Sequence, residues 1–232
     1  MKARHIGILA CSAEGAALCY RTICIEAGEF LGQHNHPEIT MHTHPLSQYM
    51  DYIRKNDWES VSRLMLSSLD ILAQAGAEFI ICPDNTIHQA FPLVEPYTPI
   101  PWLHIAEEVA KVAIRHEYRK LGITGTKYLM TGPVYTTILE AKKIGHEIPD
   151  ADDRERIDHI IFSELVNSIF TESSRLFLNK VIQKFNDRGC KAVVLGCTEI
   201  PLLVDPNDCT LPVLDSTRIL ARAALKHSLG LE

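Results

Sequence analysis

A carboxylate and a thiol follow strand-like apolar runs at corresponding places in the two halves of this chain. Asp84 comes shortly after the run Phe79–Ile81, and Cys197 shortly after the run Ala192–Leu195. Both side chains can take up and release protons, as general acids and bases do. In a chain built twice over, we expect the two strand ends to face each other with a ligand between them. That arrangement suits an enzyme that moves a proton from one face of a carbon to the other.

A second pair of matching segments supports an internal repeat. Ile100-Pro101-Trp102-Leu103 and Leu211-Pro212-Val213-Leu214 each lead into a helical stretch. Alanines fall nine and twelve positions after each proline, and they are Ala110 and Ala113 in the first half and Ala221 and Ala224 in the second. The spacing therefore predicts two halves of the same design.

Each candidate also has a plainer interpretation. On propensity alone, Asp84-Asn85-Thr86 is a helix-capping turn, and a single cysteine such as Cys197 is most often a small buried core residue. The repeat favours the functional interpretation of both, and Thr198 beside Cys197 adds a polar donor for a carboxylate. Strand alternation places Cys82 deeper, so we assign it to the core.

The overall composition excludes several classes of partner. The 232 residues are 46% hydrophobic and carry a formal charge of −6, which argues against nucleic acid or an anionic membrane as the main partner. No apolar run reaches membrane-spanning length, and the start of the chain lacks a signal-peptide core. The chain has seven cysteines and no CxxC pair, which indicates reduced thiols rather than a disulfide framework. We therefore expect a cytoplasmic protein.

Strands and helices alternate along the chain. The patterns predict strands at 5–10, at 38–44 and at the two runs before Asp84 and Cys197, and a strand with its turn at 121–126 and at 147–150. They predict helices at 13–29, 57–76, 104–116, 128–143 with a break near Gly132, 151–165 and 172–188. This alternation predicts an α/β fold of two pseudo-symmetric domains, each a mainly parallel sheet flanked by helices, with the active-site cleft between them. We place the N-terminal domain at 1–105, completed by the C-terminal helix 216–230, and the C-terminal domain at 106–215.

Two His-x-His pairs raise the question of a metal site. His42 and His44 share one face of a predicted strand, while His34 and His36 fall in a predicted loop. No acidic or cysteine partner has clear metal-ligand spacing, so we predict no metal and assign these histidines to the surface or to the lining of the cleft.

Several motifs together resemble the aspartate/glutamate racemase superfamily, in particular its aspartate and broad-specificity acidic amino-acid branch. They cover nearly the whole chain and are 6–9, 84–88, 148–150, 160–165, 170–175 and the Gly-Cys-Thr-Glu-Ile motif at 196–200. The resemblance implies an amino-acid racemase that needs no cofactor, pyridoxal phosphate included. It also implies a site between two α/β domains, and relatives suggest a homodimer.

The resemblance carries over to site residues one by one. It implies that Cys197 is catalytic and that Asp84 stands where the family has its first catalytic cysteine. We assign substrate binding to residues at the same strand ends, which are Ser12, Thr43, Asn85, Thr86 and Thr198. The opening turn, 10–14, departs from the family pattern, which places its contacts with substrate in question.

Asp84 in place of a cysteine breaks the symmetry of the acid–base pair. An aspartic acid side chain has an ordinary pKa of about 3.9, so at neutral pH it is ionised and serves as a base. To act as an acid it must be protonated, which burial beside a thiolate favours. We therefore expect strongly one-sided turnover on aspartate- or glutamate-like substrates.

Two alternatives remain open at this point. A related dicarboxylate isomerase or decarboxylase would use Cys197 in the same cleft, and tests on malonates and maleate separate it from a racemase. A two-lobed protein that binds a small acid without catalysis would show binding with no hydrogen exchange.

Overall fold

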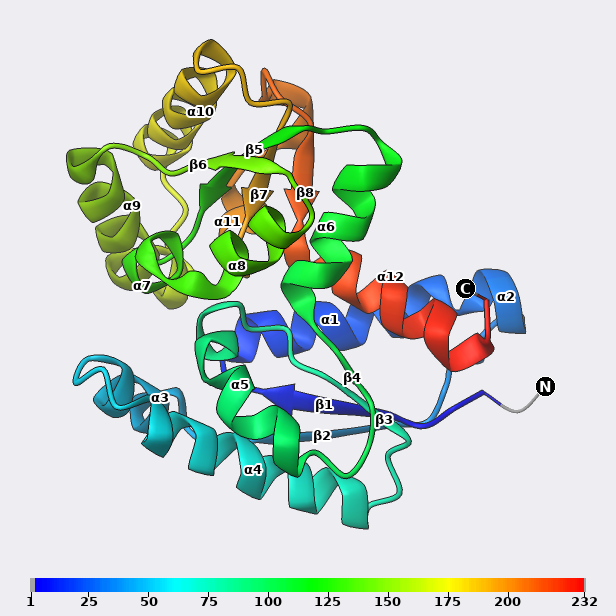
Figure 1. Ribbon diagram of the computed structural model, residues 1–232. Helices are drawn as coiled ribbons and strands as arrows, with labels where there is room; N and C mark the ends of the chain where they lie inside the picture. Colours follow the sequence, from blue (N-terminus) through cyan, green and yellow to red (C-terminus); the bar gives the residue numbers. More distant parts are fainter. Residues whose placement is uncertain (1–2, 232) are drawn as a thin grey trace. The chain divides into compact units, whose positions relative to one another are not determined.

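The computed structural model describes residues 3–231, which form two compact units. The first unit runs to Ile105 and takes in the C-terminal segment from Thr217, and the second runs from Ala106 to Ser216. Each unit holds a four-stranded parallel sheet with helices around it, so the predicted α/β fold is confirmed. Figure 1 shows the elements of both units.

The first unit builds its sheet in the order β2-β1-β3-β4. Its strands are β1 (Ile6–Ala10), β2 (Ile39–Thr43), β3 (Phe79–Ile81) and β4 (Trp102–Leu103). Its helices are α1 (Ala13–Glu26), α2 (Gly28–Leu31), α3 (Leu46–Ile53), α4 (Trp58–Gln74), η1 (Thr86–Ala90), α5 (Phe91–Val94), η2 (Glu95–Tyr97) and α12 (Ser216–Leu229), which begins at the boundary of the unit.

The second unit repeats this order with β6-β5-β7-β8. Its strands are β5 (Lys120–Thr124), β6 (Gly145–Glu147), β7 (Ala192–Leu195) and β8 (Val213–Asp215). Its helices are α6 (Ile105–Arg115), α7 (Lys127–Thr131), α8 (Pro133–Ala141), α9 (Ala151–Ser163), η3 (Leu165–Asn167), α10 (Glu172–Asp187), α11 (Ile200–Leu203) and η4 (Pro206–Asp208).

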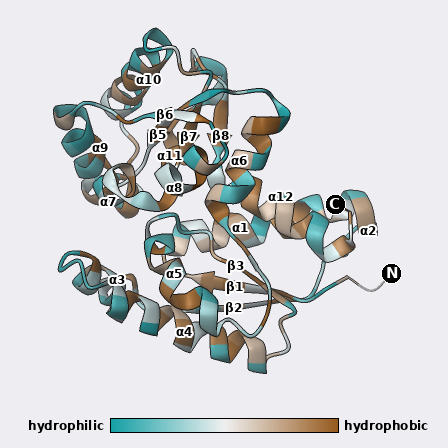
Figure 2. Ribbon diagram, in the orientation of Figure 1, coloured by the Kyte–Doolittle hydropathy of each residue, from teal (hydrophilic) through white to brown (hydrophobic). Residues whose placement is uncertain are grey.

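The core of the first unit forms where α1 and α12 pack on one face of the sheet. Alternate residues of β1 and β3 point into this layer, and Figure 2 shows these strands as mainly hydrophobic. Ala221 and Ala224 of α12 are fully buried here, and their small side chains let the helix approach the sheet closely. The alanines of the repeat are therefore packing residues, and Ala110 and Ala113 of α6 are likewise fully buried.

The core of the second unit joins α9 and α10 to β7. Phe185 of α10 and Ile157 of α9 lie in one buried cluster with Val193 and Leu195 of β7. Cys197 belongs to the same cluster, so the packing that stabilises this unit also fixes the base of the turn after β7.

Equivalent strands are paired in the same way in the two sheets. Ile8 of β1 pairs with Ile81 of β3, and Ile123 of β5 pairs with Val194 of β7. Beyond the central strand, Ile81 pairs with Leu103 and Val194 pairs with Leu214. Asp84 and Cys197 each lie three residues after the equivalent strand position. The two side chains therefore occupy matching places at the carboxyl ends of β3 and β7.

Most of the predicted elements are present, with differences at two places. The helix expected at 13–29 divides at Ala27 into α1 and α2. The strand and turn expected at 147–150 lie earlier in the chain, because β6 ends at Glu147 and Asp150 is already the residue before α9. The helix expected at 128–143 breaks at Gly132, as predicted, because Pro133 opens α8. Among the residues described, no helix is both long and apolar enough to cross a membrane.

Candidate active site

The carboxyl edge of the first sheet gathers most of the predicted site residues of that unit. In a parallel sheet all strands end at the same edge, which is where open α/β sheets bind ligands. Ser12 follows β1, Thr43 is the last residue of β2, and Asp84 follows β3. The pairing of Ala10 with Thr43 and of Ile8 with Ile81 places these three residues along one edge.

Asp84 is held by hydrogen bonds from its own loop. Its Oδ1 accepts from the N–H of Ile87 at 3.2 Å, so the capping interaction expected from propensity is present. Its main-chain carbonyl accepts from Nδ1 of His88 at 2.7 Å and from the thiol of Cys82 at 3.8 Å. Asn85 beside it is buried. One carboxylate oxygen and the main-chain carbonyl of Asp84 are therefore both hydrogen-bonded within this loop.

Cys82 is a core residue, as its place in the strand predicts. Its side chain is fully buried. Burial, followed by the nearby charge of Asp84, raises the pKa of the Cys82 thiol well above its ordinary value. A buried thiol with a raised pKa is unreactive, which agrees with a packing role for Cys82.

A buried aromatic and histidine cluster lies behind Asp84. His88 is 2% exposed, and its ring lies 4.5 Å from the ring of His104 and 5.9 Å from that of Trp102, centre to centre. Burial, and then the proximity of His104, lowers the pKa of His88 well below its ordinary value. Burial lowers the pKa of His104 to about 4. Both rings are therefore neutral at neutral pH.

Cys197 lies beside a buried carboxylate. Its thiol donates to Oε2 of Glu199 at 2.9 Å, and the hydroxyl of Thr198 donates to the same oxygen at 2.8 Å. The three side chains are between 4% and 8% exposed. The Cys197 thiol and the Thr198 hydroxyl thus converge on one oxygen of the Glu199 carboxylate.

Glu199 is a buried neighbour of Cys197 that the sequence reasoning did not place among the site residues. The Gly-Cys-Thr-Glu motif contained the signal, because a glutamate two residues after a cysteine can turn back onto it. The pattern alone did not show whether this side chain would point outwards or inwards. Its burial and its contact with Cys197 answer that question.

The first loops of the two sheets are built alike. Ser12 caps α1 by accepting from the N–H of Gly15 at 3.3 Å, and Thr126 caps α7 by accepting from the N–H of Leu129 at 3.3 Å. The cap on Ser12 is as predicted.

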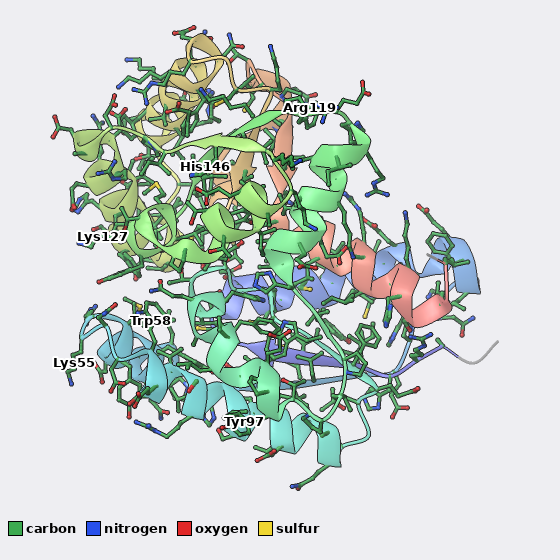
Figure 3. All side chains as sticks on the ribbon, viewed as in Figure 1. Lys55, Trp58, Tyr97, Arg119, Lys127 and His146 are labelled. Atoms are coloured by element: carbon green, nitrogen blue, oxygen red, sulfur yellow. The ribbon has the colours of Figure 1, made fainter. Side chains whose placement is uncertain are left out.

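Two charged or polar residues near these edges are already engaged. Lys127, labelled in Figure 3, donates its main-chain N–H to Asp158 at 2.8 Å, and its Nζ lies 3.9 Å from the same carboxylate. Thr43 is exposed and donates its hydroxyl to the carbonyl of His44 at 3.0 Å.

Two histidines, His42 in β2 and His44 just after it, contact serines of α4. His42 shares a hydrogen bond with Ser68 at 3.0 Å, and His44 shares one with Ser67 at 2.6 Å. Their rings lie 4.9 Å apart. Within residues 3–231 no cluster of three or more His, Cys, Asp or Glu side chains is arranged to hold a metal ion.

Known proteins match this architecture over nearly its whole length. The sequence model of the Asp/Glu/hydantoin racemase family matches residues 8–224. A solved structure from Yersinia pestis, provisionally assigned as an Asp/Glu racemase, superposes with a TM-score of 0.90 at 32% identity, covering 97% of this chain and 99% of the other. An aspartate racemase homologue from Pyrococcus horikoshii superposes with a TM-score of 0.85 at 26% identity, covering 99% and 100%. The broad-specificity amino-acid racemase of Bacillus subtilis is 20% identical over 84% of each chain.

Proposed function

Because this chain belongs to the Asp/Glu/hydantoin racemase family and is thus an amino-acid racemase, an isomerase, we propose that it racemises aspartate- or glutamate-like acids by proton transfer at Cα. We assign the two proton-transfer roles to Asp84 and Cys197. The reaction we propose uses no cofactor.

The observation that carries the proposal is the equivalence of two strand ends. Asp84 and Cys197 follow the same register position of two sheets with the same strand order. Racemisation needs one group that removes the α-hydrogen and another that returns a proton to the opposite face. A repeated architecture supplies one such group from each half of the chain.

The hydrogen bonds around Asp84 and Cys197 suggest which of them is the base and which the acid before substrate binds. Asp84 accepts an N–H bond that favours its carboxylate, while Cys197 donates its hydrogen to Glu199. A carboxylate and a thiol are the correct base and acid for one enantiomer. In that direction Asp84 takes the α-hydrogen and the Cys197 thiol gives its proton to the other face of the carbanion.

The opposite direction needs the opposite protonation states. Asp84 must then carry a proton, and Cys197 must be a thiolate whose proton has passed to Glu199. Since the resting contacts favour neither of these states, we propose that exchange of the two enantiomers is unequal. Hydroxyls and amides at the strand ends would bind the substrate carboxylates, and we assign this role to Ser12, Thr43, Asn85, Thr86 and Thr198.

The test is replacement of the α-hydrogen by deuterium in D₂O, followed by proton NMR. L- and D-aspartate and L- and D-glutamate are each incubated with the wild type, Asp84→Asn and Cys197→Ser. We expect Asp84→Asn to lose exchange of one enantiomer and Cys197→Ser to lose exchange of the other, because each base deprotonates its own face. Equal exchange of both enantiomers by the wild type, or exchange of both by Asp84→Asn, would contradict the assignment.

A further inference from the structure

The buried ring of His88 makes a short hydrogen bond to the main chain of Asp84. The Nδ1 atom of His88 lies 2.7 Å from the main-chain carbonyl oxygen of Asp84, four residues earlier. A carbonyl oxygen can only accept, so Nδ1 must carry the hydrogen. The contact therefore fixes the tautomer of His88, with its hydrogen on Nδ1 and a lone pair on Nε2.

The second ring nitrogen is buried without a hydrogen-bond partner. Within residues 3–231, Nε2 of His88 finds none. An unsatisfied buried polar atom destabilises a fold by roughly 1–3 kcal/mol, so its presence calls for an explanation. Since Nδ1 is fully used and Nε2 is not, the bond to Asp84 is the polar interaction that this histidine provides.

Packing holds the ring of His88 in one orientation. The rings of His104, Trp102 and Phe91 lie 4.5, 5.9 and 6.3 Å from it, centre to centre. Three neighbouring rings at these distances restrict the rotation of the His88 ring. The N–H of His88 is therefore a rigid anchor for the peptide group that follows Asp84.

The rest of the loop adds to this restraint. Oδ1 of Asp84 accepts from the N–H of Ile87, and the thiol of Cys82 also points to the Asp84 carbonyl. The main-chain carbonyl and the Oδ1 atom of Asp84 are thus both held by hydrogen bonds, and this fixes the direction in which the Oδ2 atom points. Because His88 is neutral, its influence on Asp84 is geometric and adds no charge next to the carboxylate.

The corresponding residue in the second unit cannot do the same. Four residues after Cys197 stands Pro201, whose side chain has no donor. Cys197 is instead held through its own sulfur by Glu199. One proton-transfer group is fixed through its main chain, and the other through its side chain.

We propose that His88 is a positioning residue for Asp84, holding its main-chain carbonyl so that the carboxylate stays aligned with the α-hydrogen it removes. This proposal rests on the proposed function. It predicts that loss of the Nδ1 donor weakens exchange of the enantiomer served by Asp84 and spares the enantiomer served by Cys197. A residue that only stabilised the fold would affect both enantiomers alike.

The experiment compares five variants of the full chain with the wild type by hydrogen–deuterium exchange at Cα of both enantiomers, with rates taken per folded protein from circular dichroism. His88→Asn places an amide N–H where Nδ1 was, His88→Gln places it nearer the position of Nε2, and His88→Leu has no donor. Trp102→Phe is the packing control, because it disturbs the same cluster and leaves the bond to Asp84 intact. Asp84→Asn identifies which enantiomer depends on Asp84.

We expect His88→Leu and His88→Gln to slow exchange of that enantiomer by about 10- to 100-fold, since small misplacements of a catalytic group cost rates of this order. His88→Asn should stay within a few-fold of the wild type, and the other enantiomer should change less than about twofold in all variants, as a geometric effect on one group requires. If His88→Leu does not fold, the comparison of Asn with Gln decides.

Two outcomes overturn the role of His88 alone. In one, the wild type exchanges both enantiomers, but His88→Gln and His88→Asn exchange the Asp84-dependent enantiomer at the same rate. In the other, the His88 variants slow both enantiomers equally. A wild type that exchanges neither acid contradicts the proposed function itself, and the role of His88 with it.

Discussion

Acidification should destabilise the first unit through its buried histidines. Burial holds the pKa of His104 at about 4, against an ordinary value of 6.5, and also lowers that of His88. Between these two pH values the unfolded chain binds protons that the folded chain does not. The free energy of unfolding therefore falls as the pH falls from about 6.5 towards about 4, and is fully restored above that range.

The pKa of about 4 for His104 sets the size of this effect. Integrating the difference in bound protons from pH 7 to pH 5 gives a loss of about 2 kcal/mol from His104 alone. His88 adds a loss of the same sign. Carboxylates with lowered pKa, such as Asp150 and Glu147, lose their contribution only at lower pH, so they fall largely outside this interval.

Urea unfolding at pH 7 and pH 5, followed by circular dichroism, measures the difference. We expect His104→Asn to reduce the pH-dependent loss by about 2 kcal/mol, because asparagine does not titrate. His34→Asn is the matched control, since His34 is exposed, and it should leave the loss unchanged. The reasoning is refuted if wild type and His104→Asn lose the same stability between the two pH values.

Two further predictions concern the second unit. Gly122→Ala should destabilise the fold by about 1–3 kcal/mol in urea unfolding, because its new Cβ would lie 2.5 Å from the ring of Phe185. Gly28→Ala is the control, because a Cβ at Gly28 would have no atom within 4 Å. Equal destabilisation by both substitutions would contradict this prediction. Glu199→Gln should speed alkylation of Cys197 by iodoacetamide at neutral pH, measured by peptide mass spectrometry, because the charge that opposes a thiolate is gone. An unchanged rate would show that Glu199 does not control the thiol.

The sequence alone was sufficient for the elements and for the equivalence of the two strand ends. Hydrophobic periodicity and capping residues act over a few positions, so they are visible in the chain itself. Counting residues along the chain was enough to find the repeated spacing of prolines and alanines. It also showed that Asp84 and Cys197 follow their strands at the same distance. Motif resemblance indicated the family for the same reason, since short motifs keep their spacing whatever packs around them.

The tertiary structure decided how each reactive group is held. Whether Glu199 turned towards Cys197 depended on the buried cluster around β7, which joins residues far apart in the chain. The anchoring of Asp84 by His88 depended on the rings of Trp102 and His104, which reach it from β4 and the residue after it. The direction of a side chain is set by the neighbours that exclude its other rotamers, and those neighbours are brought together only by folding.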